Sequence, residues 1–103
     1  MFIRFFIVAN TKIEAINIVK PFTDNLRKKQ TDFSSIEPYW KIKSMYVVNI
    51  CIQSTVSDVD FNSFINSIGT GWSYYDNEWV ISKSNVDCKI HDSRVYMVTI
   101  YSM

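Results

Sequence analysis

The chain has 103 residues, of which 48% are hydrophobic and 16% aromatic, and its formal net charge is +1. This length fits a single domain over residues 1–103, and the apolar content excludes an intrinsically disordered chain. The near-neutral balance gives no indication of a strongly charged partner. We expect one globular domain that folds without disulfides or a metal.

The first ten residues are mostly apolar and favour β structure. They predict a strand over residues 2–9 that is buried on both faces and therefore central in its sheet. Arg4 interrupts the apolar run, which is also too short for a signal peptide or a transmembrane helix. We therefore expect a cytoplasmic protein without membrane association, in which Cys51 and Cys88 stay reduced.

A capping-box pattern, Thr11 followed by Glu14, predicts the start of a helix. Its apolar positions recur at spacings of three and four residues: Ala15, Ile16, Val19, Phe22 and Leu26. Pro21 lacks a backbone donor, so the helix is expected either to kink there or to stop and restart. The cations at residues 27–29 suit its C-terminal end.

A polar loop is predicted over residues 30–38, followed by one long strand over residues 39–54. The apolar side chains of that strand share one parity and are expected to face the core: Trp40, Ile42, Tyr46, Val48, Ile50 and Ile52. The polar side chains share the other parity and are expected to face solvent: Lys41, Lys43, Asn49 and Gln53.

The second half predicts one more helix and three more strands. Ser57 is the expected N-cap of the helix, and Gly69 is expected to end it in a left-handed conformation. Asp76 and Asn77 predict a hairpin turn between two strands. The remaining segments are a strand over 71–75, a strand over 78–84, a loop over 85–92 and a final strand over 93–102.

The predicted order is β-α-β-α-β-β-β. Two helices with one apolar face each need a sheet face to bury against, which predicts an α+β two-layer sandwich. Its sheet is mostly antiparallel and carries both helices on one face. We expect a variant of the ferredoxin-like arrangement, because a single strand is recognisable between the helices where that arrangement has two.

The sequence contains no recognisable active site. Its only histidine, His91, follows Cys88 at a spacing that supplies at most half of a zinc site. His91, Asp92 and Ser93 are consecutive, so their side chains diverge and cannot form a hydrolase triad. Two glycines are too few for a phosphate-binding loop. We expect no enzymatic activity, no metal and no cofactor, and the role of Cys88 and His91 stays open.

Charge is distributed unevenly along the chain. Residues 1–50 contain eight Lys and Arg against four acids, whereas residues 51–103 contain three against six. The acids of the second half lie near a cluster of aromatic residues, a composition typical of interaction hot spots. The predicted partner-binding surface consists of Asp58, Asp60, Trp72, Tyr75, Asp76, Glu78, Asp87 and Asp92.

The short element order and the segment 71–80 (Gly-Trp-Ser-Tyr-Tyr-Asp-Asn-Glu-Trp-Val) give the chain a family resemblance. It is similar to small immunity proteins of bacterial contact-dependent growth inhibition and related polymorphic toxin systems. The resemblance implies a protein without catalytic activity that binds a cognate toxin domain, often a nuclease. Such binding blocks the active site or the access of substrate, and a basic toxin would dock on the acidic second half.

Two alternatives stay open. A ferredoxin-like regulatory domain would use the same aromatic residues to line a small-ligand pocket or a homodimer seam. An RNA-binding module would use a basic strand face that contains Tyr39, Lys41, Lys43 and Met45. The Lys/Arg-Gly-aromatic signature of that module is missing, so nucleic acid is the less favoured partner.

Overall fold

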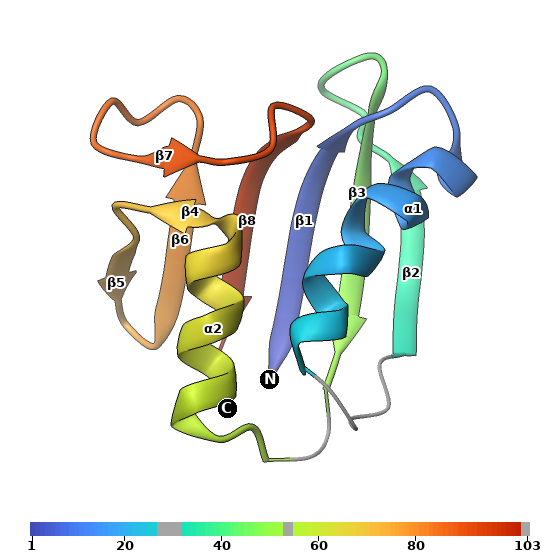
Figure 1. The fold of residues 1–103 in the computed structure, drawn as a ribbon. Coiled ribbons are helices and arrows are strands. Elements are labelled where there is room, and N and C mark those ends of the chain that lie inside the picture. The colour runs from blue at the N-terminus through green and yellow to red at the C-terminus, as the bar shows by residue number, and fades with distance from the viewer. Residues whose placement is uncertain (27–31, 53–54, 102–103) are drawn as a thin grey trace.

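A computed structural model describes residues 1–26, 32–52 and 55–101 (Figure 1). Its elements in chain order are β1 (Phe2–Val8), α1 (Lys12–Thr23), a short 3-10 helix η1 (Asp24–Leu26), β2 (Asp32–Pro38), β3 (Met45–Cys51), α2 (Asp58–Ile68), β4 (Gly69–Thr70), β5 (Ser73–Tyr75), β6 (Glu78–Ser82), β7 (Lys89–Ile90) and β8 (Val95–Tyr101). Six strands form one sheet in the order β2-β3-β1-β8-β6-β5, while β4 pairs with β7. Both helices lie on one face of the large sheet (Figure 1), which confirms the predicted α+β two-layer sandwich.

Within the described residues, two strands lie between the helices, where the sequence predicted a loop and one long strand. β2 occupies most of the predicted loop, and the predicted strand over 39–54 is a turn followed by β3. The turn reverses the chain at Ser44, which adopts a positive φ of 61°. β1, α1, β2, β3, α2 and β8 therefore complete a β-α-β-β-α-β unit. The β5–β6 hairpin extends this sheet beyond β8.

The hydrophobic core lies between the sheet and the two helices. Alternate residues of the central strands are fully buried there: Ile3, Ile7, Val48, Ile50, Ile81, Val98 and Ile100. Phe5 joins both helices, since its ring stacks on Phe22 of α1 at 6.0 Å and meets Phe64 of α2 edge-on at 6.3 Å. β1 is central as predicted, but Phe2 and Arg4 are half exposed on the other face. The expectation of a strand buried on both faces is therefore wrong.

α1 begins as the capping box predicted. Thr11 Oγ1 accepts a hydrogen bond from the Glu14 amide at 3.1 Å, and the Glu14 carboxylate accepts one from the Asn10 amide at 3.2 Å. The helix does not stop at Pro21 but continues through it to Thr23. Proline removes one backbone donor, and the packing of α1 on the sheet outweighs that loss. The predicted cations at 27–29 lie outside the described residues.

α2 has the predicted cap and a different end. Ser57 Oγ accepts a hydrogen bond from the amide three residues further on, at 3.2 Å. The helix ends at Gly69, whose φ of 168° is extended, so the expected left-handed conformation is wrong. Glycine is required there by close packing, because a Cβ would lie 2.2 Å from the Lys89 carbonyl oxygen of β7. The left-handed glycine is Gly71, with a φ of 84°.

The β5–β6 hairpin turns at the predicted residues. Asp76 and Asn77 have φ values of 54° and 64°, as a type I′ turn requires. The predicted loop over 85–92 contains the short strand β7, which holds β4 at the end of α2. No helix within the described ranges has the length and apolar character needed to span a membrane.

Candidate functional site

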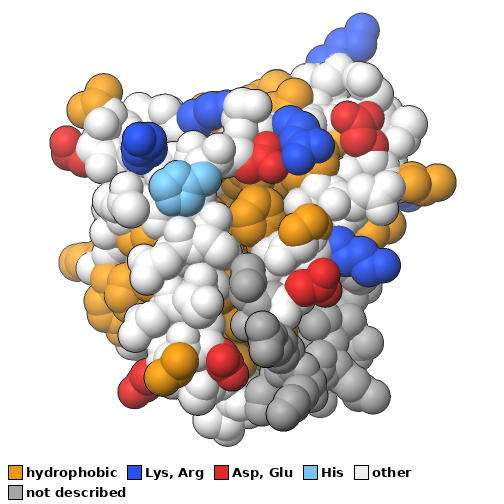
Figure 2. Space-filling model, in the orientation of Figure 1, with side chains coloured by type: hydrophobic (Ala, Val, Ile, Leu, Met, Phe, Trp, Pro, Cys, Tyr) orange, Lys and Arg blue, Asp and Glu red, His pale blue; other side chains and the backbone are white. Residues whose placement is uncertain are grey.

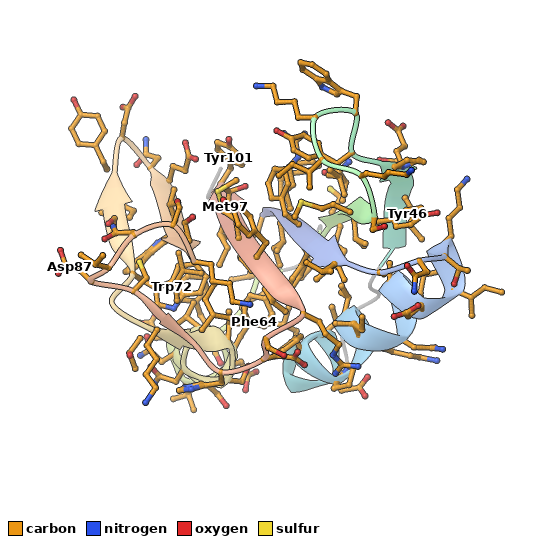
Figure 3. The ribbon with its side chains drawn as sticks, turned by 90° about the horizontal axis from the view of Figure 1, so that it is seen from above. Tyr46, Phe64, Trp72, Asp87, Met97 and Tyr101 are labelled. Atoms are coloured by element: carbon orange, nitrogen blue, oxygen red, sulfur yellow. The ribbon has the colours of Figure 1, made fainter. Side chains whose placement is uncertain are left out.

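The large sheet has one face that no other element covers within the described part of the chain. Figure 3 shows Met97 and Tyr101 on this side and Phe64 on the side of the helices. Residues directly opposite each other in antiparallel strands share a face. One row across this uncovered face therefore consists of Phe2, Tyr101, Glu78 and Tyr75.

Aromatic side chains reach solvent at both edges of this uncovered face. Tyr75 is 84% exposed at the β5 edge, and Trp40 is 83% exposed in the turn over residues 39–44. Tyr39 anchors that turn, because its ring packs edge-on against Phe6 of β1 at 5.2 Å. Trp40 and Ile42 were predicted to face the core, and the structure exposes both of them. That prediction is wrong because they belong to a turn and not to a strand.

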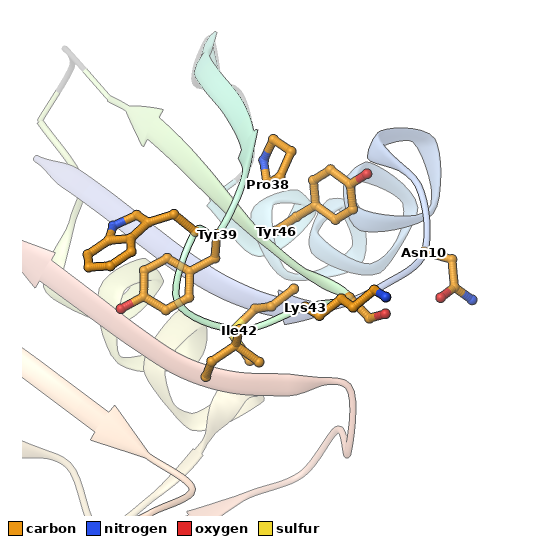
Figure 4. A pocket seen from close by; sticks show the side chains of 9 residues that line it. Asn10, Pro38, Tyr39, Ile42, Lys43 and Tyr46 are labelled. Carbon is orange, nitrogen blue, oxygen red and sulfur yellow. The ribbon is translucent and has the colours of Figure 1, made fainter.

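Two hollows flank the 39–44 turn. The first, of about 390 Å³, lies among Asn10, Tyr39, Ile42, Lys43 and other residues of the turn and of β3 (Figure 4). The second, of about 290 Å³, opens on the uncovered face. It is lined by Arg4, Phe6, Glu37, Pro38, Tyr39, Trp40, Val47 and Asn49. The uncovered face thus combines exposed rings with a recess that contains charged groups.

A polar network fixes one cation in the second hollow. Arg4 Nε donates to Asn49 Oδ1 at 2.8 Å, and Asn49 Nδ2 donates to Ser35 Oγ at 2.6 Å. The guanidinium carbon lies 5.6 Å from the centre of the Phe2 ring. Opposite Arg4 on β8, the buried hydroxyl of Thr99 has no hydrogen-bond partner among the described residues. Arg4 therefore keeps its terminal donor groups at the centre of the uncovered face, whereas the Thr99 hydroxyl is covered by its surroundings.

The acidic residues predicted to bind the partner do not form one surface. The turn before β6 and the loop after it lie at opposite ends of that strand, so Asp76 and Asp87 are far apart. α2 begins near the end of β6 that carries the Asp76 turn. It ends at β4, which pairs with β7. The acids at the start of α2 are Asp58 and Asp60. Figure 2 shows this division, with acidic side chains at the lower left over the start of α2 and again across the top.

Asp92 already has a partner within the chain. Its carboxylate pairs with the Arg94 guanidinium at 2.8 Å and also accepts a hydrogen bond from the Arg94 amide at 2.9 Å. The side-chain hydrogen bond from Arg94 lowers the pKa of Asp92, although burial opposes it. This charge is therefore largely neutralised before any partner arrives. Of the predicted residues, Tyr75, Asp76 and Glu78 are the ones that border the uncovered face.

Trp72 was predicted to contact a partner, but the structure gives it an internal role. It is half buried against the core, on the side of the helices (Figure 3). Its indole N–H donates to the Ile65 and Gly69 carbonyl oxygens, each at 3.1 Å. The Ile65 carbonyl also accepts the Gly69 amide, so the indole N–H, shared between two acceptors, adds a second donor where the helix ends. Trp72 therefore stabilises the C-terminal end of α2.

We predict that Trp72→Phe lowers the free energy of unfolding by about 1–2 kcal/mol, because the indole N–H donor is lost while a smaller aromatic ring still fills most of the site. Urea denaturation followed by fluorescence measures the change. Tyr75→Phe is the matched control, since Tyr75 is 84% exposed and should shift stability by less than about 0.5 kcal/mol. Equal stability of both variants would contradict the capping role of Trp72.

Cys88 and His91 lie apart from the uncovered face, whereas Cys51 lies on that face opposite Phe2. Cys88 Sγ donates to the Gly71 carbonyl oxygen at 3.2 Å, and the His91 amide donates to the Ile68 carbonyl oxygen at 2.9 Å. Among the described residues, no group of three His, Cys, Asp or Glu side chains is placed to hold a metal ion. No family model, curated protein or solved structure matches the chain.

Three residues of the uncovered face were missed by the sequence interpretation: Arg4, Trp40 and Tyr101. A signal for Arg4 was present, because Phe2, Arg4 and Phe6 share one parity of the first strand. A cation in a central strand is rarely buried without a partner, so this parity indicated a face open to solvent. Trp40 carried no such signal.

Proposed function

We propose that this protein is an immunity protein that binds a cognate bacterial toxin domain in the cytoplasm and neutralises it. The observation that carries the proposal is the uncovered sheet face with Trp40, Tyr75 and Tyr101 exposed on or beside it. Exposed Trp and Tyr residues dominate the binding energy of protein interfaces. The toxin is a nuclease by the family resemblance, and binding blocks its active site or its access to substrate.

Charge at two corners of the uncovered face supports a directed interaction with a protein. The turn that contains Lys41 and Lys43 lies beside the C-terminal end of β1, where β3 begins. The turn that contains Asp76 directly precedes Glu78, the first residue of β6. Glu78 pairs with Tyr101 of β8, and Tyr101 pairs with Phe2 at the N-terminal end of β1. A basic and an acidic corner on one diagonal would orient a partner with complementary charges.

Co-expression with the protein encoded immediately upstream tests this function. We expect the upstream protein to stop growth when produced alone, and to be harmless when this chain is produced with it. The two should co-purify at a 1:1 ratio, the stoichiometry of one toxin domain blocked by one inhibitor. A lack of toxicity together with a lack of complex would overturn the proposal.

A homodimer that uses the same uncovered face is the second candidate function. It is favoured by the apolar row of Phe2 and Tyr101, whose rings lie 6.2 Å apart with no covering layer among the described elements. Sedimentation of the isolated chain separates the two candidates, because a regulatory dimer forms without a partner. The RNA-binding arrangement considered from the sequence is not formed as a strand face, since Lys41 and Lys43 lie in a turn and Met45 is buried.

A further inference from the structure

Arg4 is the charged group on the uncovered face whose position is most firmly fixed. The Asn49 side chain holds its Nε, and the Phe2 ring lies 5.6 Å from the guanidinium carbon. Among residues 1–24, 26, 35–52 and 55–101, whose side chains the structure describes, its two terminal nitrogens have no hydrogen-bond or ion-pair partner. Cations that are removed from solvent are normally paired. A half-buried arginine with its fork free is therefore equipped to bind an anion from outside the chain.

The hollow beside Arg4 has the walls that such an anion requires. Arg4 and Asn49 lie on the sheet at its floor, and Tyr39 and Trp40 from the 39–44 turn rise at its side. Trp40 keeps 83% of its surface exposed, so its ring is available to an incoming apolar group. The recess thus places hydrogen-bond donors next to an aromatic surface.

The local charge balance favours an anionic occupant. Arg4 lines this hollow and Lys43 lines the neighbouring one, while the Lys41 ammonium lies 5.0 Å from the centre of the Trp40 ring between them. Glu37 is the acid that lines the second hollow, and it is exposed and forms no ion pair with Arg4. An oppositely charged partner would therefore stabilise the half-buried Arg4 guanidinium more than it would Glu37, since solvent already stabilises Glu37.

We propose that this hollow receives a carboxylate side chain of the protein partner, held by the Arg4 fork while an adjacent apolar group packs on Trp40. The inference rests on the proposed function and adds the chemistry of the contact. An arginine and a carboxylate can form two parallel hydrogen bonds, which fixes orientation as well as affinity. The partner thus presents an Asp or Glu beside an apolar residue to the basic side of the uncovered face.

Two substitutions with opposite expected signs test this contact against the upstream-encoded protein. Arg4→Gln should weaken binding about tenfold or more, mainly through faster dissociation, because a desolvated charge pair is lost. Glu37→Gln should tighten binding about twofold to fivefold, because it removes a like charge from the neighbourhood of the bound carboxylate. Lys20→Gln is the matched control, since it removes an exposed positive charge from α1 on the helix side. It should leave the dissociation constant unchanged.

Folding is checked separately from binding. Arg4→Gln removes the donor to Asn49, so its thermal unfolding is compared with that of Arg4→Lys, which keeps the charge and lacks the planar fork. Arg4→Lys should recover part of the affinity and remain weaker than the native chain. Glu37 is exposed, so Glu37→Gln reports on binding even if both Arg4 variants unfold.

The possible outcomes separate the contact from the proposed function. A tight native complex with unchanged affinity for Arg4→Gln and Glu37→Gln would overturn the carboxylate contact and leave the immunity function standing. Tighter binding by Arg4→Gln together with weaker binding by Glu37→Gln would show that a cation occupies the hollow. Binding of a single-stranded RNA oligonucleotide that Arg4→Gln abolishes would replace the carboxylate by a phosphate. Absence of any complex with the native chain would overturn the proposed function itself.

Discussion

Replacing Trp40 by alanine is expected to weaken binding of the proposed toxin partner about 30-fold, which corresponds to roughly 2 kcal/mol. The indole is 83% exposed, and its aromatic and cation–π contacts are the Tyr39 ring at 6.4 Å and the Lys41 ammonium at 5.0 Å. The folded chain therefore loses little when it is removed. Calorimetric titration with the upstream-encoded protein measures the affinity, and thermal unfolding of the free variant measures the stability.

Val86→Ala is the matched control for this prediction. Val86 is 97% exposed, but it lies in the loop between β6 and β7, away from the 39–44 turn. Its removal should change neither affinity nor stability by more than about 0.5 kcal/mol. If both variants bind as tightly as the native chain, Trp40 is not an anchor and the contact surface lies elsewhere.

Local signals predicted the parts of the fold that depend on neighbouring residues. Thr11 and Ser57 cap their helices as expected, because an N-cap needs a side-chain acceptor within three residues of its donor. Asp76 and Asn77 form the expected turn, because both tolerate positive φ. The two-layer arrangement followed from the apolar faces of the two helices.

The failures in the first half share one physical cause. Apolar and polar residues alternate from Trp40 to Ile52, and the same alternation continues through the 39–44 turn as in β3. Alternation reports which residues share a side and gives no information on where the chain reverses. β2 escaped recognition because an edge strand made largely of polar residues resembles a loop, and its pairing with β3 provides the stability.

The candidate site depended on long-range pairing even more strongly. Tyr75 and Glu78 reach the uncovered face because β6 pairs with β8, a contact between segments that no local pattern specifies. Asp87 lies at the other end of β6 because its loop follows that strand and leads into β7, which pairs with β4. Trp72 is a residue type that is common in interaction hot spots. In the structure, however, it lies at the end of α2 and its indole N–H donates to backbone carbonyls. Residue type alone could not separate these roles.

Phe64→Ala is expected to cost about 3–5 kcal/mol of unfolding free energy, since it opens a cavity at the centre of the core. Phe64 has no exposed surface and meets the Phe5 ring edge-on at 6.3 Å, at the contact between α2 and β1. A domain of this size has a total stability of only about 5–15 kcal/mol. Urea denaturation measures the loss as a lower midpoint with an unchanged slope.

Ser63→Ala, at an exposed position of α2, is the control for Phe64→Ala and should shift stability by less than about 0.5 kcal/mol. If the proposed immunity function holds, Phe64→Ala should also reduce protection from the toxin in cells, because a smaller fraction of the chain is folded. Its folded fraction should still bind with native affinity, since Phe64 lies on the helix side of the sheet (Figure 3). Trp40→Ala should lose protection with the stability intact. An affinity loss for folded Phe64→Ala as large as that for Trp40→Ala would place the partner on the helical layer instead of the uncovered face.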